Sequence, residues 1–254
     1  MFLQPIVIAA YVVVCTFGSA MLGLVLRVYL PDHHLRNDPK DVVKLIMGLI
    51  ATLVALVLGL LIASANGYYN TQRDELQSLS ANIVNLDQTL ARYGPEANAT
   101  RAAFHEVVVA GHDRIWQTKG TISVRPPPQQ ESALSVFRDG LLSLTPATDA
   151  QRHLLTQATG IADNLLATRL LMSVQIGNSV SWPFLIILVF WVSVLFLGFG
   201  LLSEWNGTLL AALLVGSAAV GSATFLILEL NQPYTGLLRL SDAPLQQAIA
   251  QFTR

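Results

Sequence analysis

The sequence predicts an all-α integral membrane protein with four transmembrane helices and a helical extramembrane bundle formed by extensions of helices two and three. Only 12% of the 254 residues are charged, against about 25% in soluble domains. Four charge-free apolar runs are each about 20 residues long, which suits a hydrocarbon core about 30 Å thick. Between the second and third runs, apolar residues recur with a helical period. These three observations together predict the fold class.

The four apolar runs define the expected membrane segments. They extend from Pro5 to Leu26, from Leu45 to Ala65, from Pro183 to Leu202 and from Thr208 to Leu228. With their flanking turns, we expect transmembrane helices over about 5–29, 42–66, 181–202 and 207–229. The chain then divides into a transmembrane hairpin (1–66), an extramembrane helical bundle (67–179), a second hairpin (180–230) and a short C-terminal amphipathic helix (231–254).

The distribution of Lys and Arg predicts how the protein is oriented. The first short loop, "RVYLPDHHLRNDPKDVVK", contains Arg27, Arg36, Lys40 and Lys44, whereas the second, "SEWNG", contains neither residue type. Short loops rich in Lys and Arg stay in the cytoplasm. We therefore expect a multi-pass protein of the inner cell membrane whose central region and both termini lie on the non-cytoplasmic side.

The second helix is expected to continue beyond the membrane as a stalk. No Pro interrupts the sequence between Leu45 and Arg92, and the weak point at Asn66-Gly67 does not forbid continuation. Apolar residues three and four positions apart then form a stalk seam typical of a helix packed against other helices: Leu76, Leu79, Ile83, Leu86, Leu90 and Tyr93. Gly94-Pro95 ends this helix. Further helices are expected over about 96–116, over 131–144 and from the "TPATD" caps onward. The last of them is expected to pause near Gly177-Asn178, before the third membrane segment.

The membrane part of helix two contains a ridge of small residues. They are Gly48, Ala51, Ala55, Gly59 and Ala63. Small residues let helices approach closely in lipid, so a tight contact within or between subunits is one interpretation. The other is the smooth apolar surface of a pore. Under the second interpretation, the bulkier candidates for apolar gates are Val54, Leu58 and Ile62.

Charged residues at the ends of the membrane segments are candidates for a pore mouth or for interfacial anchoring. They are Arg27, Lys40, Asp41, Lys44 and Glu229. Asp38 and Pro39 begin a helix in the usual way, and Asp41 and Lys44 are three apart, close enough to pair. Capping and anchoring therefore explain these charges, and an ion-attracting vestibule is the alternative. Glu229, a carboxylate at a membrane boundary, is expected at the interface or hydrogen-bonded to a neighbouring helix.

Composition and motifs exclude several other function classes. A net charge of −1 provides no basic footprint for nucleic acid. We find no nucleophile elbow, phosphate loop, HExxH motif or paired catalytic carboxylates, so an enzyme is not expected. The single cysteine, Cys15, is expected to pack or face lipid. Adjacent His33 and His34 lack the spacing of helical metal ligands, and no constellation completes His105 and His112, so neither a metal nor a cofactor is expected.

Three stretches resemble one bacterial protein family. They are "DVVKLIMGLIATLVALVLGLLIASA", "QRDELQSLSANIVNLDQTLARYGPEA" and "LILELNQPYTGLLRLSDAPLQQAI", and they are similar to four-helix membrane proteins named bestrophin-like. Bestrophins proper are pentameric anion channels whose second helix lines the pore. The resemblance therefore implies that helix two and its helical extension are arranged around a central axis. Two features depart from bestrophins proper. Bestrophins proper keep the helical region in the cytoplasm, whereas the charge bias here places it outside. Helix two here contains no Phe for an aromatic constriction, so no pore residue is transferred from bestrophins proper.

Two functions remain open on the sequence. The first is a homo-oligomeric channel-like protein that passes anions, with helix two nearest the axis. The alternative is a non-conducting membrane scaffold or accessory subunit, whose bundle binds a partner protein. Both place the chain in a lipid bilayer.

Overall fold

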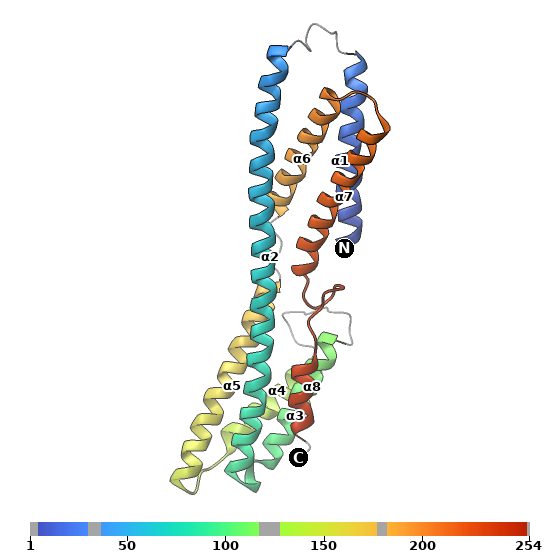
Figure 1. The fold of residues 1–254 in the computed structure, drawn as a ribbon. Coiled ribbons are helices and arrows are strands. Elements are labelled where there is room, and N and C mark those ends of the chain that lie inside the picture. Colours follow the sequence, from blue (N-terminus) through green and yellow to red (C-terminus); the bar gives the residue numbers. More distant parts are fainter. Residues whose placement is uncertain (1–4, 30–36, 117–127, 177–181, 253–254) are drawn as a thin grey trace. The chain divides into compact units, whose positions relative to one another are not determined.

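The structure is a computed structural model that describes residues 5–29, 37–116, 128–176 and 182–252. All regular structure in these ranges is helical (Figure 1). The elements are α1 (Pro5–Tyr29), α2 (Asn37–Tyr93), a 3-10 turn η2 (Pro95–Ala97), α3 (Asn98–Trp116), α4 (Pro128–Ser143), α5 (Asp149–Ile176), α6 (Trp182–Leu202), α7 (Gly207–Leu230) and α8 (Ala243–Gln251).

The chain divides into two compact units. We call Met1–Tyr68 with Val180–Asn231 the spanning unit, and Tyr69–Ser179 with Gln232–Arg254 the bundle unit. Helix α2 contributes residues to both units. The four helices long and apolar enough to cross a membrane are α1, α2, α6 and α7, which confirms the expected all-helical fold with four apolar spans. Helices α1, α6 and α7 begin and end within one residue of the expected spans, whereas α2 begins at Asn37 and continues to Tyr93; the end of the membrane part along α2 stays a prediction.

Close backbone contact holds the spanning unit together around α1, which packs against α6 and α7. An added Cβ at Gly200 of α6 would overlap the carbonyl oxygen of Ala20 in α1. A Cβ at Gly23 of α1 would likewise overlap the carbonyl oxygen of Leu197 in α6. In lipid, helices associate by van der Waals packing of this kind, because lipid tails are as apolar as the side chains. Glycine is therefore required where α1 crosses α6.

Buried hydroxyl groups in the spanning unit bond to their own helices. Thr16 donates to the carbonyl of Val12 at 2.8 Å, Ser217 to that of Leu213 at 2.9 Å, and Thr224 to that of Val220 at 3.0 Å. All three residues are fully buried. An unsatisfied hydroxyl in an apolar interior is costly, and a bond to the carbonyl four residues earlier removes that cost. These residues serve as small packing residues with their polarity satisfied.

Helix α2 runs unbroken for 57 residues, through Asn66-Gly67, and ends at Tyr93. Gly94 follows with φ of 128°, a left-handed conformation that glycine adopts without the strain of a Cβ. The side-chain amide of Gln151 donates to the carbonyl oxygen of Tyr93 at 3.1 Å, which satisfies one of the last carbonyls of α2. The helix therefore ends at Gly94-Pro95 because the backbone of Gly94 adopts a left-handed conformation.

The bundle unit encloses an apolar core shared by the extension of α2 and by α3, α4, α5 and α8. Its buried members include Ile83, Leu86, Leu90, Tyr93, Phe104, Val108, Phe137, Leu141, Ala158, Ile161 and Leu245. A partly buried ion pair joins α2 to α3, where Arg101 Nη2 lies 2.7 Å from Asp87 Oδ2. The hydrogen bonds to Asp87 raise the pKa of Arg101 above its ordinary value, so the guanidinium stays charged.

One expectation about the bundle differs from the structure, and another lies outside the residues that the structure describes. Helix α4 covers Pro128–Ser143, and so begins three residues earlier than the expected 131–144. The expected pause near Gly177-Asn178 lies outside the described residues, between the end of α5 at Ile176 and the start of α6 at Trp182. Helix α8 packs on α3, with Leu245 and Ala248 in the core.

Candidate functional site

The membrane part of α2 has three distinct faces. Successive residues of an α-helix are rotated by about 100°, so residues three or four positions apart lie on the same side. In α2 the buried, the bulky and the small residues follow this spacing. The first face is buried: Met47 and Val54 belong to the core of the spanning unit, with Ile50, Ala51, Val57, Leu58 and Leu61 packed against it. The Met47 side chain lies over Gly198 of α6, where an added Cβ would come within 2.8 Å of its sulfur. This face packs within the chain.

The second face is exposed and bulky. Leu45, Leu49, Leu56 and Leu60 are between 63% and 75% exposed in the single chain. Large branched side chains without polar atoms are what a surface in contact with lipid tails requires. We call these residues, together with Val42, Ile46 and Leu53, the bulky face.

The third face is exposed and small. Gly48, Ala55, Gly59 and Ala63 are exposed, and Ala51 borders them. Ala63, five full turns after Leu45, lies at the edge shared with the bulky face. A Cβ added to Gly48 or Gly59 would meet nothing within 4 Å. Lys44, Thr52, Ile62 and Asn66 fall on the same side at about 100° per residue. We call this set the small face; within the chain's own fold, its glycines are not needed for close packing.

The three residues named as apolar gates therefore lie on different sides of α2. Val54 is 9% exposed and lies in the core of the spanning unit. Leu58 packs against that core. Ile62 is partly exposed and lies on the small face, three residues after Gly59 and seven residues after Ala55. Of the three, Ile62 is the large apolar side chain directed toward the small face.

The charged residues at the membrane boundary are largely paired. Arg27 Nη2 lies 3.1 Å from Glu204 Oε1, which ties the end of α1 to the segment between α6 and α7. Among the described residues, nothing accepts a hydrogen bond from the buried Nη1 of Arg27. Lys44 Nζ lies 3.1 Å from Asp41 Oδ1, and both side chains are exposed. Lys40 belongs to the first turn of α2, and its side chain lies outside the described residues. Glu229 is 2% exposed near the end of α7.

The stalk seam lies in the interior of the bundle unit. Leu76, Ile83, Leu86, Leu90 and Tyr93 are each at most 4% exposed, and Leu79 packs beside them. Leu76 belongs to a second apolar cluster with Met172, Tyr234 and Leu240. Within that region the Tyr234 hydroxyl donates to Gln72 Oε1 at 3.1 Å, and both residues are buried. The seam therefore closes within this chain over its described length.

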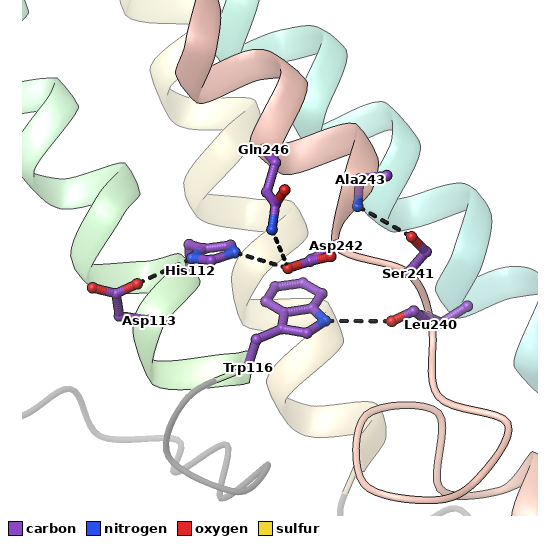
Figure 2. Close-up of polar contacts among 8 residues, drawn as sticks. All are labelled: His112, Asp113, Trp116, Leu240, Ser241, Asp242, Ala243 and Gln246. Atoms are coloured by element: carbon purple, nitrogen blue, oxygen red, sulfur yellow. Dashed lines mark hydrogen bonds and ion pairs between the residues drawn. The ribbon is translucent and has the colours of Figure 1, made fainter.

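A polar cluster attaches α8 to α3 in the bundle unit (Figure 2). His112 lies between two carboxylates, with Nδ1 3.1 Å from Asp113 Oδ1 and Nε2 3.2 Å from Asp242 Oδ2. Gln246 donates to the same Asp242 oxygen at 2.6 Å, and Trp116, stacked on His112, donates to the carbonyl of Leu240 at 3.3 Å. Asp242 thus links α3 to α8.

Sequence reasoning missed this cluster because its members are far apart in the chain. Asp242 lies 130 residues after His112, and only the neighbouring Asp113 was visible beside that histidine. At the start of α8, Ser241 Oγ accepts from the Ala243 amide at 3.2 Å, whereas Asp242 makes no side-chain cap bond. One of the two carboxylates beside the His112 ring is therefore too distant in sequence for a local pattern to reveal.

Comparisons with known proteins agree with this architecture. A crystal structure of a bacterial bestrophin homologue from Klebsiella pneumoniae is similar, with a TM-score of 0.66 and 12% sequence identity over 96% of this chain and 97% of that chain. At this identity the likeness establishes the fold, a multi-pass helical membrane architecture. No curated protein matches the sequence. The family model of the Bestrophin-like domain matches residues 14–245, so the chain belongs to the Bestrophin-like family.

Proposed function

We propose that the protein is a homo-oligomeric membrane channel that conducts anions, with the small face of α2 nearest the axis. The observation that carries the proposal is the division of the exposed surface of α2 into a bulky face and a small face. Membership of the Bestrophin-like family supports the same conclusion, because bestrophins proper form oligomeric anion channels around their second helix.

The exposure of α2 supports an assembly. Only 11% of the residues in its apolar window are buried within the chain, against 28% to 39% for the other three spans. A symmetric oligomer repeats the same surface in every subunit, so one face of α2 from each copy can surround a common axis. The bulky face then contacts lipid or a neighbouring subunit, and the small face surrounds the axis.

The side chains of the small face provide a route to gating and selectivity. Ile62 is the large aliphatic residue among small and polar neighbours, so a ring of Ile62 side chains forms the narrowest apolar point. Apolar constrictions gate by losing water, and selectivity comes from charges or backbone dipoles near the mouth. Lys44 lies on the same face at the start of the span. Arg27 is paired with Glu204 and Lys44 with Asp41, which leaves Lys40 as the charge proposed to attract anions.

The test compares two substitutions of similar size on one helix. Ile62→Ala removes bulk from the small face, and Leu60→Ala removes bulk from the bulky face two residues away. We expect purified protein in liposomes to conduct chloride above the empty-liposome background. Ile62→Ala should raise the chloride flux several-fold and Leu60→Ala should leave it unchanged, because only Ile62 faces the axis.

Two results would contradict the proposal. Flux no greater than that of empty liposomes over a range of anions would favour the non-conducting scaffold, whose bundle binds a partner protein. Equal flux changes in both variants would mean that the small face is not nearest the axis.

A further inference from the structure

The bundle unit contains a cavity of about 300 Å³ between its helices. Aliphatic and aromatic side chains form most of its wall, among them Leu79, Phe104, Leu134, Leu165 and Leu166. Cavities of roughly 300–1,000 Å³ with apolar walls and a few polar groups are typical of small-molecule sites. The wall suits a hydrocarbon chain.

Two arginines lie at the lining of this cavity. Arg114 comes from α3 and Arg169 from α5, and among the described lining residues they are the permanently charged ones. His112 also borders the cavity, but both of its ring nitrogens already face carboxylates, those of Asp113 and Asp242 (Figure 2). The positive charge that the cavity offers to a ligand therefore comes from Arg169.

The surroundings of Arg169 disfavour its positive charge. Burial lowers the pKa of Arg169 below its ordinary value, and the positive charge of Arg114 lowers it further. An anionic group bound beside Arg169 would offset both effects and accept charge-assisted hydrogen bonds from its guanidinium group. The electrostatics of the site are therefore complementary to an anion.

We propose that this cavity binds a single-chain amphiphile with an anionic headgroup, such as a fatty acid. The hydrocarbon chain lies along the apolar wall, and the carboxylate binds Arg169, with Arg114 close by. The small volume favours one acyl chain over the two chains of an intact phospholipid. The proposal concerns the bundle unit alone and does not depend on conduction through the spanning unit.

The experiment measures binding of a fluorescent fatty acid, dansylamino-undecanoic acid, to the full-length protein in lipid nanodiscs. We expect a saturable, blue-shifted emission above that of empty nanodiscs. Lauric acid should displace the probe, and dodecanol should do so at least about tenfold less well, because it lacks the anionic group. A tenfold difference corresponds to about 1.4 kcal/mol, which the loss of one charge-assisted hydrogen bond is enough to cause.

Matched variants test the site itself. Arg169→Gln should weaken probe binding about tenfold or more, whereas Arg92→Gln, at an exposed arginine of the same unit, should leave it unchanged. Leu166→Trp should abolish binding by filling the cavity, with a melting temperature close to that of the wild type showing that the bundle is folded. This variant keeps the proposal testable if Arg169→Gln does not fold.

Several outcomes would overturn the proposal. They are the absence of a saturable signal, equal displacement by dodecanol, or equal affinities of folded Arg169→Gln and Arg92→Gln. Native mass spectrometry of the purified protein adds a second criterion: a bound single-chain acid lost in Leu166→Trp supports the site, and an intact phospholipid lost in the same variant contradicts it. Because none of these measurements uses ion flux, failure of the channel proposal would leave their outcome unaffected.

Discussion

At the scale of single residues, glycines with similar sequence surroundings have opposite structural roles. Gly200 lies where α6 touches the backbone of α1, and Gly59 lies where an added Cβ would meet nothing within 4 Å. Both occur in long apolar runs, so the sequence alone does not distinguish a packing glycine from an exposed one. The difference arises from which face of each helix meets another helix, and only the three-dimensional arrangement reveals it.

The first prediction uses this difference. Gly200→Ala should destabilise the protein by about 2–3 kcal/mol, because its Cβ would overlap the carbonyl oxygen of Ala20 and overpacking of this kind forces backbone shifts. For a chain of this size the loss corresponds to a melting temperature lower by roughly 5–10 °C, measured on purified protein in detergent. Gly18→Ala is the control, since nothing lies within 4 Å of its added Cβ; equal melting temperatures in both variants would contradict the observed contact.

Polar residues show how far sequence reasoning reaches at this scale. The Gly94-Pro95 break was predictable because it depends on local backbone conformation, and the structure has φ of 128° there. The link from His112 to Asp242 was not predictable, because it joins residues 130 positions apart. The Arg101–Asp87 pair spans only 14 positions, but it depends on how α2 packs against α3, which no local pattern reveals.

At the scale of elements, the four spans and the long α2 followed from apolar runs and from the absence of proline. A membrane helix that is apolar all round has no amphipathic pattern, so its packing face cannot be read from hydrophobicity. Side-chain size was the informative property in α2. Its small residues were recognised from the sequence as a ridge, and the structure places most of that ridge on an exposed face rather than at a contact within the chain.

A second prediction separates the two interpretations of that ridge. Gly59→Leu adds bulk to the small face, and Ser64→Leu adds the same bulk to the opposite exposed side at similar depth. If the small face surrounds the axis, Gly59→Leu should reduce chloride flux several-fold without changing the number of subunits measured by native mass spectrometry, and Ser64→Leu should change neither quantity. Loss of the oligomer in Gly59→Leu alone would instead mean that the ridge is a helix–helix contact between subunits.

At the scale of the whole molecule, the side of the membrane on which one segment lies determines the side of every other segment. Four spans place both short loops on one side and the central region and both termini on the other. The ion pair between Arg27 and Glu204 joins the ends of two spans at the loop side. It does not remove the charge bias, because acidic residues contribute little to orientation. The sequence therefore predicts a cytoplasmic first loop, whereas the resemblance to bestrophins proper implies a cytoplasmic bundle.

The last prediction decides between these two orientations. A reporter that is active only in the cytoplasm should be active when inserted at His34 and inactive when inserted at Gly120, if Lys and Arg in the first loop orient the chain. The double variant Arg36→Glu and Lys40→Glu should weaken this bias and raise the activity at Gly120, because it removes two of the basic residues that hold the loop inside. The reverse pattern, with Gly120 active in the unmodified chain, would contradict the charge argument and would place the bundle on the same side as in bestrophins proper. It would also place the Arg114–Arg169 cavity in the cytoplasm, so the orientation determines from which compartment a fatty acid reaches it.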